Sequence, residues 1–230
     1  MSGHSKWSQI KRKKGITDQK RGLVFSKLSR LITVAVKDGG GMGDPDKNVR
    51  LRLAVQQAKE ENMPRENIER AIEKGKGGGA DSLKEVVYEG FGPQSGSFLI
   101  VATTDNSNRT HADVKLALEK NGGKMGNINS VAYNFQKCGR IILSKSSATE
   151  VEAFEMGEKF SILDMEEDEE SYILYIPFEK IGEVRDAPVE IFYRPLTMVE
   201  LAQESHEKVS RLLDVLEDLD DVAKVYTNYA

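Results

Sequence analysis

The chain has 230 residues, which is enough for one large domain or for two to three small ones. Its 39% hydrophobic and 30% charged residues are typical of a globular protein with a packed core, and its apolar runs are too short to cross a membrane. The single cysteine, Cys138, excludes an intramolecular disulfide, and the three histidines lie too far apart in sequence for a zinc site. We therefore expect Cys138 to be a small apolar core residue, and we expect neither a metal nor another cofactor.

Positive and negative charges are segregated along the chain. Residues 1–37 hold ten Lys or Arg against one Asp or Glu, residues 38–80 hold eight of each, and residues 81–230 hold fifteen against twenty-eight. The net charge of -4 therefore hides a cationic N-terminus on an anionic body. Such asymmetry indicates a polyanion-binding surface. The alternative is that the basic segment docks on the protein's own acidic surface.

The basic segment begins as an arm and continues as a helix. Residues 1–17 lack apolar periodicity, contain the run KRKK at 11–14, and are expected to order only on contact with a partner. Residues 20–37 repeat apolar side chains at helical spacing, and a neighbouring arc of the same helix carries Lys20, Lys27, Arg30 and Lys37. The apolar face of this helix can pack against a core while the adjacent cationic face contacts a phosphate backbone.

Two shorter helices are predicted before residue 80. A glycine-rich turn at 39–46 ends the first helix, and Asn48 caps a second helix with an apolar stripe from Leu51 to Ala58. A third helix has Pro64 at its start and ends at Gly75. Residues 75–81 (GKGGGAD) are a linker and do not match a phosphate-binding P-loop.

Strands dominate the remainder of the chain. Strands are predicted at 85–91, 97–104 and 131–135, with a helix over 108–123 between the last two. Residues 140–194 then follow the order β-α-β-β-α-β of a ferredoxin-like module, with helices at 149–160 and 178–187 and with its second strand at 161–167. A long helix at 201–222 and a last strand at 223–229 lack a local partner, so we expect them to return to the 82–135 segment.

The predicted fold class is therefore α+β, with an N-terminal three-helix domain followed by two α/β domains, one ferredoxin-like and inserted in the other. The expected domains are residues 1–80, residues 81–135 plus 203–230, and the inserted residues 136–202.

Two conspicuous polar stretches have plain structural interpretations. DMEEDEE at 164–170 is expected to be a solvated turn between two strands. DNSNRTH at 105–111 has the composition of a catalytic cluster, but Asp105 or Asn108 is expected to cap a helix that Arg109 and Thr110 open. A nuclease would need clustered carboxylates for two metals. We expect no catalytic residue.

A series of motifs in fixed order resembles the YebC/PmpR family, which includes the mitochondrial translational activator of cytochrome oxidase. The motifs are GHSKW (3–7), KRGLVFSKL (20–28), GGG (39–41), NVRLR (48–52), NMPRENIERAI (62–72), YEGFGP (88–93), DNSNRT (105–110) and NSVAYNF (129–135). Val49 departs from the family's usual proline, and Met42-Gly43 lengthens the glycine turn.

The resemblance implies three domains and a cytoplasmic or organellar protein that binds nucleic acid without a cofactor. Because the match begins at Gly3, we expect no transit peptide. Family names imply a DNA-binding transcriptional regulator. Other relatives resemble ribosome-associated translation factors that bind ribosomal RNA and help proline-rich nascent chains through the ribosome. We expect the protein to bind neither a membrane nor a small-molecule substrate.

The predicted nucleic-acid-binding residues gather in the basic segment and at the start of the second helix. They are His4, Lys6, Trp7, Lys11, Arg12, Lys13, Lys14, Lys20, Arg21, Lys27, Arg30, Arg50 and Arg52. The cations are expected to contact phosphate. Trp7 either stacks on a base or docks the arm by burying its ring. Arg50 and Arg52 either extend the patch or pair with acids such as Glu60 and Glu61.

Two other classes of protein remain as alternatives. An enzyme such as a nuclease would show metal-dependent turnover. A protein-interaction scaffold would bind partners in a salt-insensitive way and would not need the arm.

Overall fold

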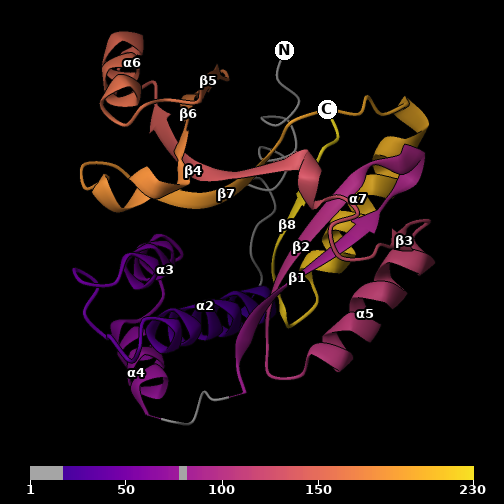
Figure 1. Ribbon diagram of the computed structural model, residues 1–230, viewed down its shortest axis with the longest axis horizontal. Coiled ribbons are helices and arrows are strands. Elements are labelled where there is room, and N and C mark those ends of the chain that lie inside the picture. The colour runs from indigo at the N-terminus through magenta and orange to yellow at the C-terminus, as the bar shows by residue number, and fades with distance from the viewer. Residues whose placement is uncertain (1–17, 78–81) are drawn as a thin grey trace. The chain divides into compact units, whose positions relative to one another are not determined.

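The computed structural model describes residues 18–77 and 82–230 (Figure 1). The described chain forms two compact units. One runs to Asn134 and includes Thr197–Tyr229, and the other is Phe135–Leu196. The fold is α+β, with an N-terminal helical region followed by α/β parts, as predicted. The three-domain limits stay a prediction.

The helical region consists of α2 (Asp18–Asp38), α3 (Val49–Glu60) and α4 (Arg65–Lys76). Asn48 caps α3, because its Oδ1 accepts from the Leu51 amide at 3.1 Å while its Nδ2 donates to the Ala35 carbonyl at 2.8 Å. The apolar stripes of the three helices form one buried core, which includes Leu28, Ile32, Ala35, Leu51, Ala54, Ala58, Ile68 and Ala71.

The third helix extends one residue beyond its predicted end. It continues through Gly75 to Lys76, and Gly77 is its C-cap. A Cβ on Gly75 would lie 2.7 Å from Val36 and 2.8 Å from the Thr33 carbonyl. Gly75 therefore permits close packing of α4 on α2 rather than ending the helix.

The first sheet is built from segments far apart in the sequence. Its order is β3-β1-β2-β8, from β3 (Lys124–Met125), β1 (Lys84–Phe91), β2 (Ser97–Thr104) and β8 (Val222–Thr227), and all pairs are antiparallel. Helices α5 (Ser107–Lys120) and α7 (Gln203–Glu217) contact each other and pack on it (Figure 1). The C-terminal segment thus returns to the first sheet, as the unpartnered helix and strand predicted.

Other predicted elements in this unit also differ from the structure. The C-terminal helix, predicted over 201–222, spans only Gln203–Glu217. The helix after β2 is capped by Asn106, whose Oδ1 accepts from the Arg109 amide at 3.1 Å, and not by Asp105 or Asn108. The strand predicted over 131–135 is wrong for its first part, because residues Ala132–Asn134 form a 3-10 turn. The amides of Val131 and Ala132 bind the Glu89 carboxylate and are withdrawn from strand pairing.

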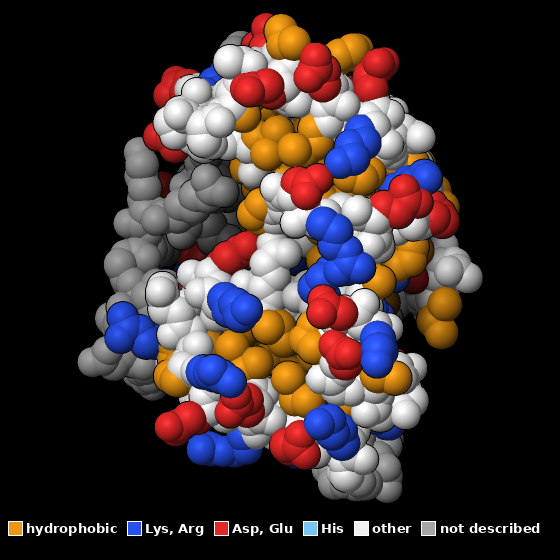
Figure 2. Space-filling model, turned by 90° about the vertical axis from the view of Figure 1, so that its left-hand side faces the viewer, with side chains coloured by type: hydrophobic (Ala, Val, Ile, Leu, Met, Phe, Trp, Pro, Cys, Tyr) orange, Lys and Arg blue, Asp and Glu red, His pale blue; other side chains and the backbone are white. Residues whose placement is uncertain are grey.

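The unit Phe135–Leu196 has the strand order of a ferredoxin-like fold. Its antiparallel sheet is β5-β6-β4-β7, from β5 (Asp164–Glu167), β6 (Ser171–Pro177), β4 (Phe135–Ser144) and β7 (Val189–Pro195), with α6 at Glu150–Lys159. This unit is acidic, with fourteen Asp or Glu against seven Lys or Arg. Figure 2 shows acidic side chains gathered at its upper end, at the height of α6 in Figure 1.

Two elements of this unit are shorter than predicted. The segment 178–187 forms only a 3-10 helix, Phe178–Glu183, and the Val184 amide closes it by donating to the Ile181 carbonyl three residues back. Strand β5 begins at Asp164 rather than at 161, because Ser161 has a left-handed φ of 61° and the Ile162 amide bonds back to α6.

Candidate nucleic-acid interface

Seven of the predicted binding residues lie outside the described part of the chain. They are His4, Lys6, Trp7, Lys11, Arg12, Lys13 and Lys14. Their contacts with nucleic acid stay predictions. The remaining six lie on α2 and α3, where the structure gives their surroundings.

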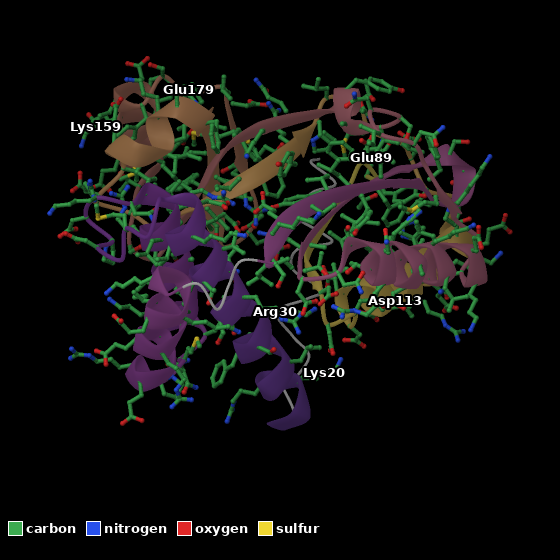
Figure 3. All side chains as sticks on the ribbon, turned by 60° about the horizontal axis from the view of Figure 1, so that its bottom comes forward. Lys20, Arg30, Glu89, Asp113, Lys159 and Glu179 are labelled. Carbon is green, nitrogen blue, oxygen red and sulfur yellow. The ribbon has the colours of Figure 1, made fainter. Side chains whose placement is uncertain are left out.

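The cationic face of α2 meets carboxylates and carbonyls at the end of α7. Arg30 donates to the Asp221 carboxylate at 2.6 Å and to the Asp220 carbonyl at 2.9 Å. Lys27 donates to the Glu217 carbonyl, and the more exposed Lys20 lies 3.8 Å from a carboxylate oxygen of Asp218. Lys20 and Arg30 project from the same side of α2 (Figure 3). On this helix the protein's own acids therefore occupy much of the predicted phosphate-binding face.

Asp221 is the centre of this contact, and its side chain is only 8% exposed. Besides Arg30, its carboxylate accepts from the Thr104 hydroxyl at 3.0 Å, the Thr110 hydroxyl at 2.7 Å and Arg109 at 2.7 Å. Burial alone would raise the pKa of Asp221, but the hydrogen bonds from Arg109 and the two threonines outweigh burial and lower the pKa below its usual value. The carboxylate is thus held charged at neutral pH.

The polar residues of the DNSNRTH stretch have structural roles, as the cap of α5 and as partners of Asp221. Helix α5 opens with Ser107 and Asn108 rather than with Arg109 and Thr110, which follow in its first turn and both bind Asp221. The sequence did not indicate Asp221, because more than 100 residues separate it from Thr110 and no local spacing connects them.

Arg50 pairs with acidic side chains, which is the second of its two predicted roles, but not with Glu60 or Glu61. It pairs instead with Asp38 and with Glu85 of β1, each at 2.8 Å. Pairing with acids is therefore confirmed for Arg50, but the partners differ from the examples expected, because the sequence could not show that β1 passes beside the start of α3. Arg52 is half-buried in the same helix.

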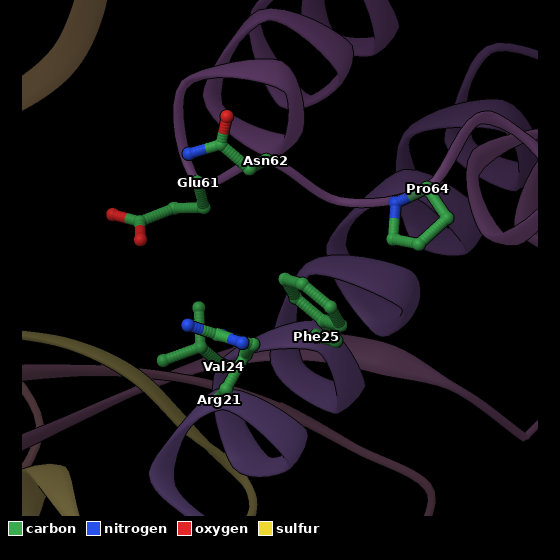
Figure 4. Close-up of a pocket in the computed structure, with 6 residues that line it drawn as sticks. All are labelled: Arg21, Val24, Phe25, Glu61, Asn62 and Pro64. Carbon is green, nitrogen blue, oxygen red and sulfur yellow. The ribbon is translucent and has the colours of Figure 1, made fainter. Parts of the chain in front are cut away.

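Arg21 lies apart from the Asp221 contact. It lines a cavity of about 450 Å³ with Val24 and Phe25 of α2, opposite Glu61, Asn62 and Pro64 of the α3–α4 turn. Figure 4 shows these side chains facing one another across the opening. An arginine beside an aromatic ring is suited to hold a planar or anionic group.

The structure also gives the environment of Cys138 and the spacing of the side chains that could hold a metal. Cys138 is fully buried in β4, and burial raises the pKa of its thiol to about 11, so it stays protonated, as expected of a core residue. Within residues 18–77 and 82–230, no three His, Cys, Asp or Glu side chains are grouped as a metal site requires. Every helix in the same ranges is too short or too polar to span a membrane.

Comparison with known proteins places the whole chain among similar sequences. Residues 5–78 match a family model described as the TACO1/YebC protein N-terminal domain, and residues 83–229 match one described as the TACO1/YebC second and third domain. A relative from Desulfosudis oleivorans is 43% identical over 99% of this chain and 96% of its own, and one from Thermus thermophilus is equally similar. Both are named probable transcriptional regulatory protein.

A solved structure supports the same assignment. The crystal structure of a conserved hypothetical protein from Aquifex aeolicus superposes with a TM-score of 0.79 at 37% identity. The match covers 93% of this chain and 91% of that one.

Proposed function

This chain belongs to the TACO1/YebC family, and we propose on that basis that it is a non-enzymatic, nucleic-acid-binding regulator of gene expression in the cytoplasm. The relatives' names support a regulatory role. The observation that carries the proposal is the segregation of charge: residues 1–17 contain five Lys or Arg and no acid. The body from residue 81 onward carries a net excess of thirteen acids and repels a polyanion.

Contact with phosphate is assigned chiefly to the arm. Lys27 and Arg30 of α2 already bind groups at the end of α7, so the cost of breaking these contacts would offset any gain from a phosphate. Lys6, Lys11, Arg12, Lys13 and Lys14 are the proposed phosphate ligands. Each neutralised phosphate releases counterions, so affinity should fall steeply with salt.

The named role of the relatives is transcriptional, which would require binding to duplex DNA. A helix that reads the major groove places side chains on base edges, and cations beside them contact the phosphates that flank the groove. The exposed face of α4 instead mixes signs: Arg65 pairs with Glu69 at 2.7 Å and Lys76 pairs with Glu73 at 2.6 Å. This observation favours a second candidate, a translation factor whose arm binds ribosomal RNA by shape and phosphate and relieves stalling on proline-rich nascent chains.

The deciding experiment compares the wild type with a variant in which Lys11, Arg12, Lys13 and Lys14 are all Ala. Co-sedimentation with ribosomes and binding to promoter-length duplex DNA are measured over a salt series. A control variant removes the same charge from the acidic body, by replacing Lys115, Lys159, Lys180 and Lys208 with Ala.

Ribosome binding that only the arm variant loses, beside weak and sequence-blind DNA binding, would identify a translation factor. Sequence-selective DNA binding that survives physiological salt, without ribosome association, would identify a transcriptional regulator. Equal binding by the wild type and the arm variant would overturn the assignment of phosphate contact to the arm.

A further inference from the structure

A buried carboxylate holds the loop that follows β3. Glu89 lies on β1 (Figure 3) and is only 6% exposed. Its carboxylate accepts from the backbone amides of Asn129 at 2.6 Å, Val131 at 2.7 Å and Ala132 at 2.8 Å. Hydrogen bonds to a charged acceptor are shorter and stronger than neutral ones. Three of them on one carboxylate fix the path of residues 129–132.

The same loop exposes two large apolar side chains. Ile128 is 87% exposed and Tyr133 is 76% exposed, whereas Val131 and Asn134 beside them are buried. The Tyr133 backbone directly follows the amide of Ala132 that Glu89 binds. Because its backbone is already anchored, this aromatic ring has little freedom left for binding to remove, so it is preorganised for contact.

In the sequence, this loop lies within a stretch that contains cations and no acid. Residues 120–149 contain five Lys or Arg and no Asp or Glu. Lys120 and Lys124, which precede the loop, are exposed, and so are the amide side chains of Asn127 and Asn129. Cations and amides beside an exposed aromatic ring match phosphate and base edges.

We propose that the 126–133 loop is a stacking platform for an unpaired nucleobase of a structured RNA, with Tyr133 beneath the base and Lys124 on a neighbouring phosphate. The inference rests on the proposed function and gives it a second contact, separate from the arm. An RNA is favoured over a protein because Lys120, Lys124 and the exposed amides of Asn127 and Asn129 flank the ring in the sequence, and a hydrophobic protein contact gives no reason for them. Stacking uses the face of the base, so the platform tolerates different sequences.

The test uses the full chain and two labelled RNAs, a hairpin with an unpaired loop and the same stem as a perfect duplex, in fluorescence anisotropy titrations. Tyr133→Ala should weaken hairpin binding about 5- to 100-fold, the loss of one base stack, and leave duplex binding unchanged. Tyr133→Phe keeps the stacking ring and should bind like the wild type. Leu116→Ala, a change at another exposed apolar residue of the same unit, is the matched control.

Salt dependence distinguishes the two contacts. Tyr133→Ala should leave the slope of log affinity against log salt unchanged, whereas Lys124→Ala should reduce it by about 0.7 to 1. Equal hairpin affinity for the wild type and Tyr133→Ala would overturn the platform and leave the proposed function standing. Failure of the wild type to bind either RNA, duplex DNA or ribosomes would overturn the proposed function itself. Loss of ribosome association with unchanged hairpin binding would assign Tyr133 to a protein contact and also overturn the platform.

Discussion

Replacement of Asp221 by Asn tests whether one carboxylate joins α2 to the sheet. Asn keeps the shape but removes the charge and offers a single acceptor oxygen to Thr104, Thr110 and Arg30. A hydrogen bond to a buried charged group contributes about 1.5–3 kcal/mol, and part of this remains with Asn, so we expect a loss of about 2–4 kcal/mol in the free energy of unfolding. This expected loss does not include the hydrogen bond from Arg109 to Asp221, because the Arg109 side chain is half exposed and water can replace that bond.

Urea unfolding followed by circular dichroism measures this loss, and a thermal scan should show the midpoint lowered by about 5–15 °C. Asp220→Asn is the matched control, because its side chain is exposed and only its backbone carbonyl binds Arg30. The control should stay within about 0.5 kcal/mol of the wild type. An Asp221→Asn variant as stable as the control would refute the reasoning.

The pH dependence gives an independent check on Asp221. Its pKa is lowered in the folded protein, so its contribution is fully present above the unfolded value of about 3.9 and is lost as pH falls through the lower folded value. The stability difference between wild type and Asp221→Asn should therefore be constant from pH 5 to 7 and shrink below about pH 4. A difference that instead grows on acidification would mean that Asp221 is not charged in the fold.

The remaining predictions concern Glu89 and Cys138. Glu89→Gln places an amide against backbone donors and should lower the free energy of unfolding by about 2–3 kcal/mol. The control is Glu85→Gln, at a half-buried site on the same strand, which should lower it by less than about 1 kcal/mol. Urea unfolding of both variants checks this, and equal losses would contradict the anchoring role of Glu89. The Cys138 thiol, buried and protonated, should resist a thiol reagent at pH 8 in the native protein and react at once in denaturant; rapid native labelling would contradict its burial.

Much of the fold followed from local sequence signals. Asn48 was identified as a helix cap because an amide side chain before an apolar helical repeat has few other roles. The β-α-β-β-α-β order of the inserted unit followed from alternating apolar patterns, and the unpartnered C-terminal helix and strand required a return to the first sheet. The elements misjudged were those with a weak or competing local signal, such as residues 131–134, whose amides bind Glu89 from another strand.

The candidate interface depended far more on tertiary structure. By itself the sequence determined the segregation of charge, the basic arm and the order of the elements, because composition and periodicity are local properties of the chain. Only the folded structure decided that Arg30 faces Asp221, that Arg50 faces Glu85, and that Glu89 anchors the loop bearing Tyr133. These contacts join residues separated by about 35 to 190 positions, and the strength of each depends on burial and distance, which a linear pattern does not contain.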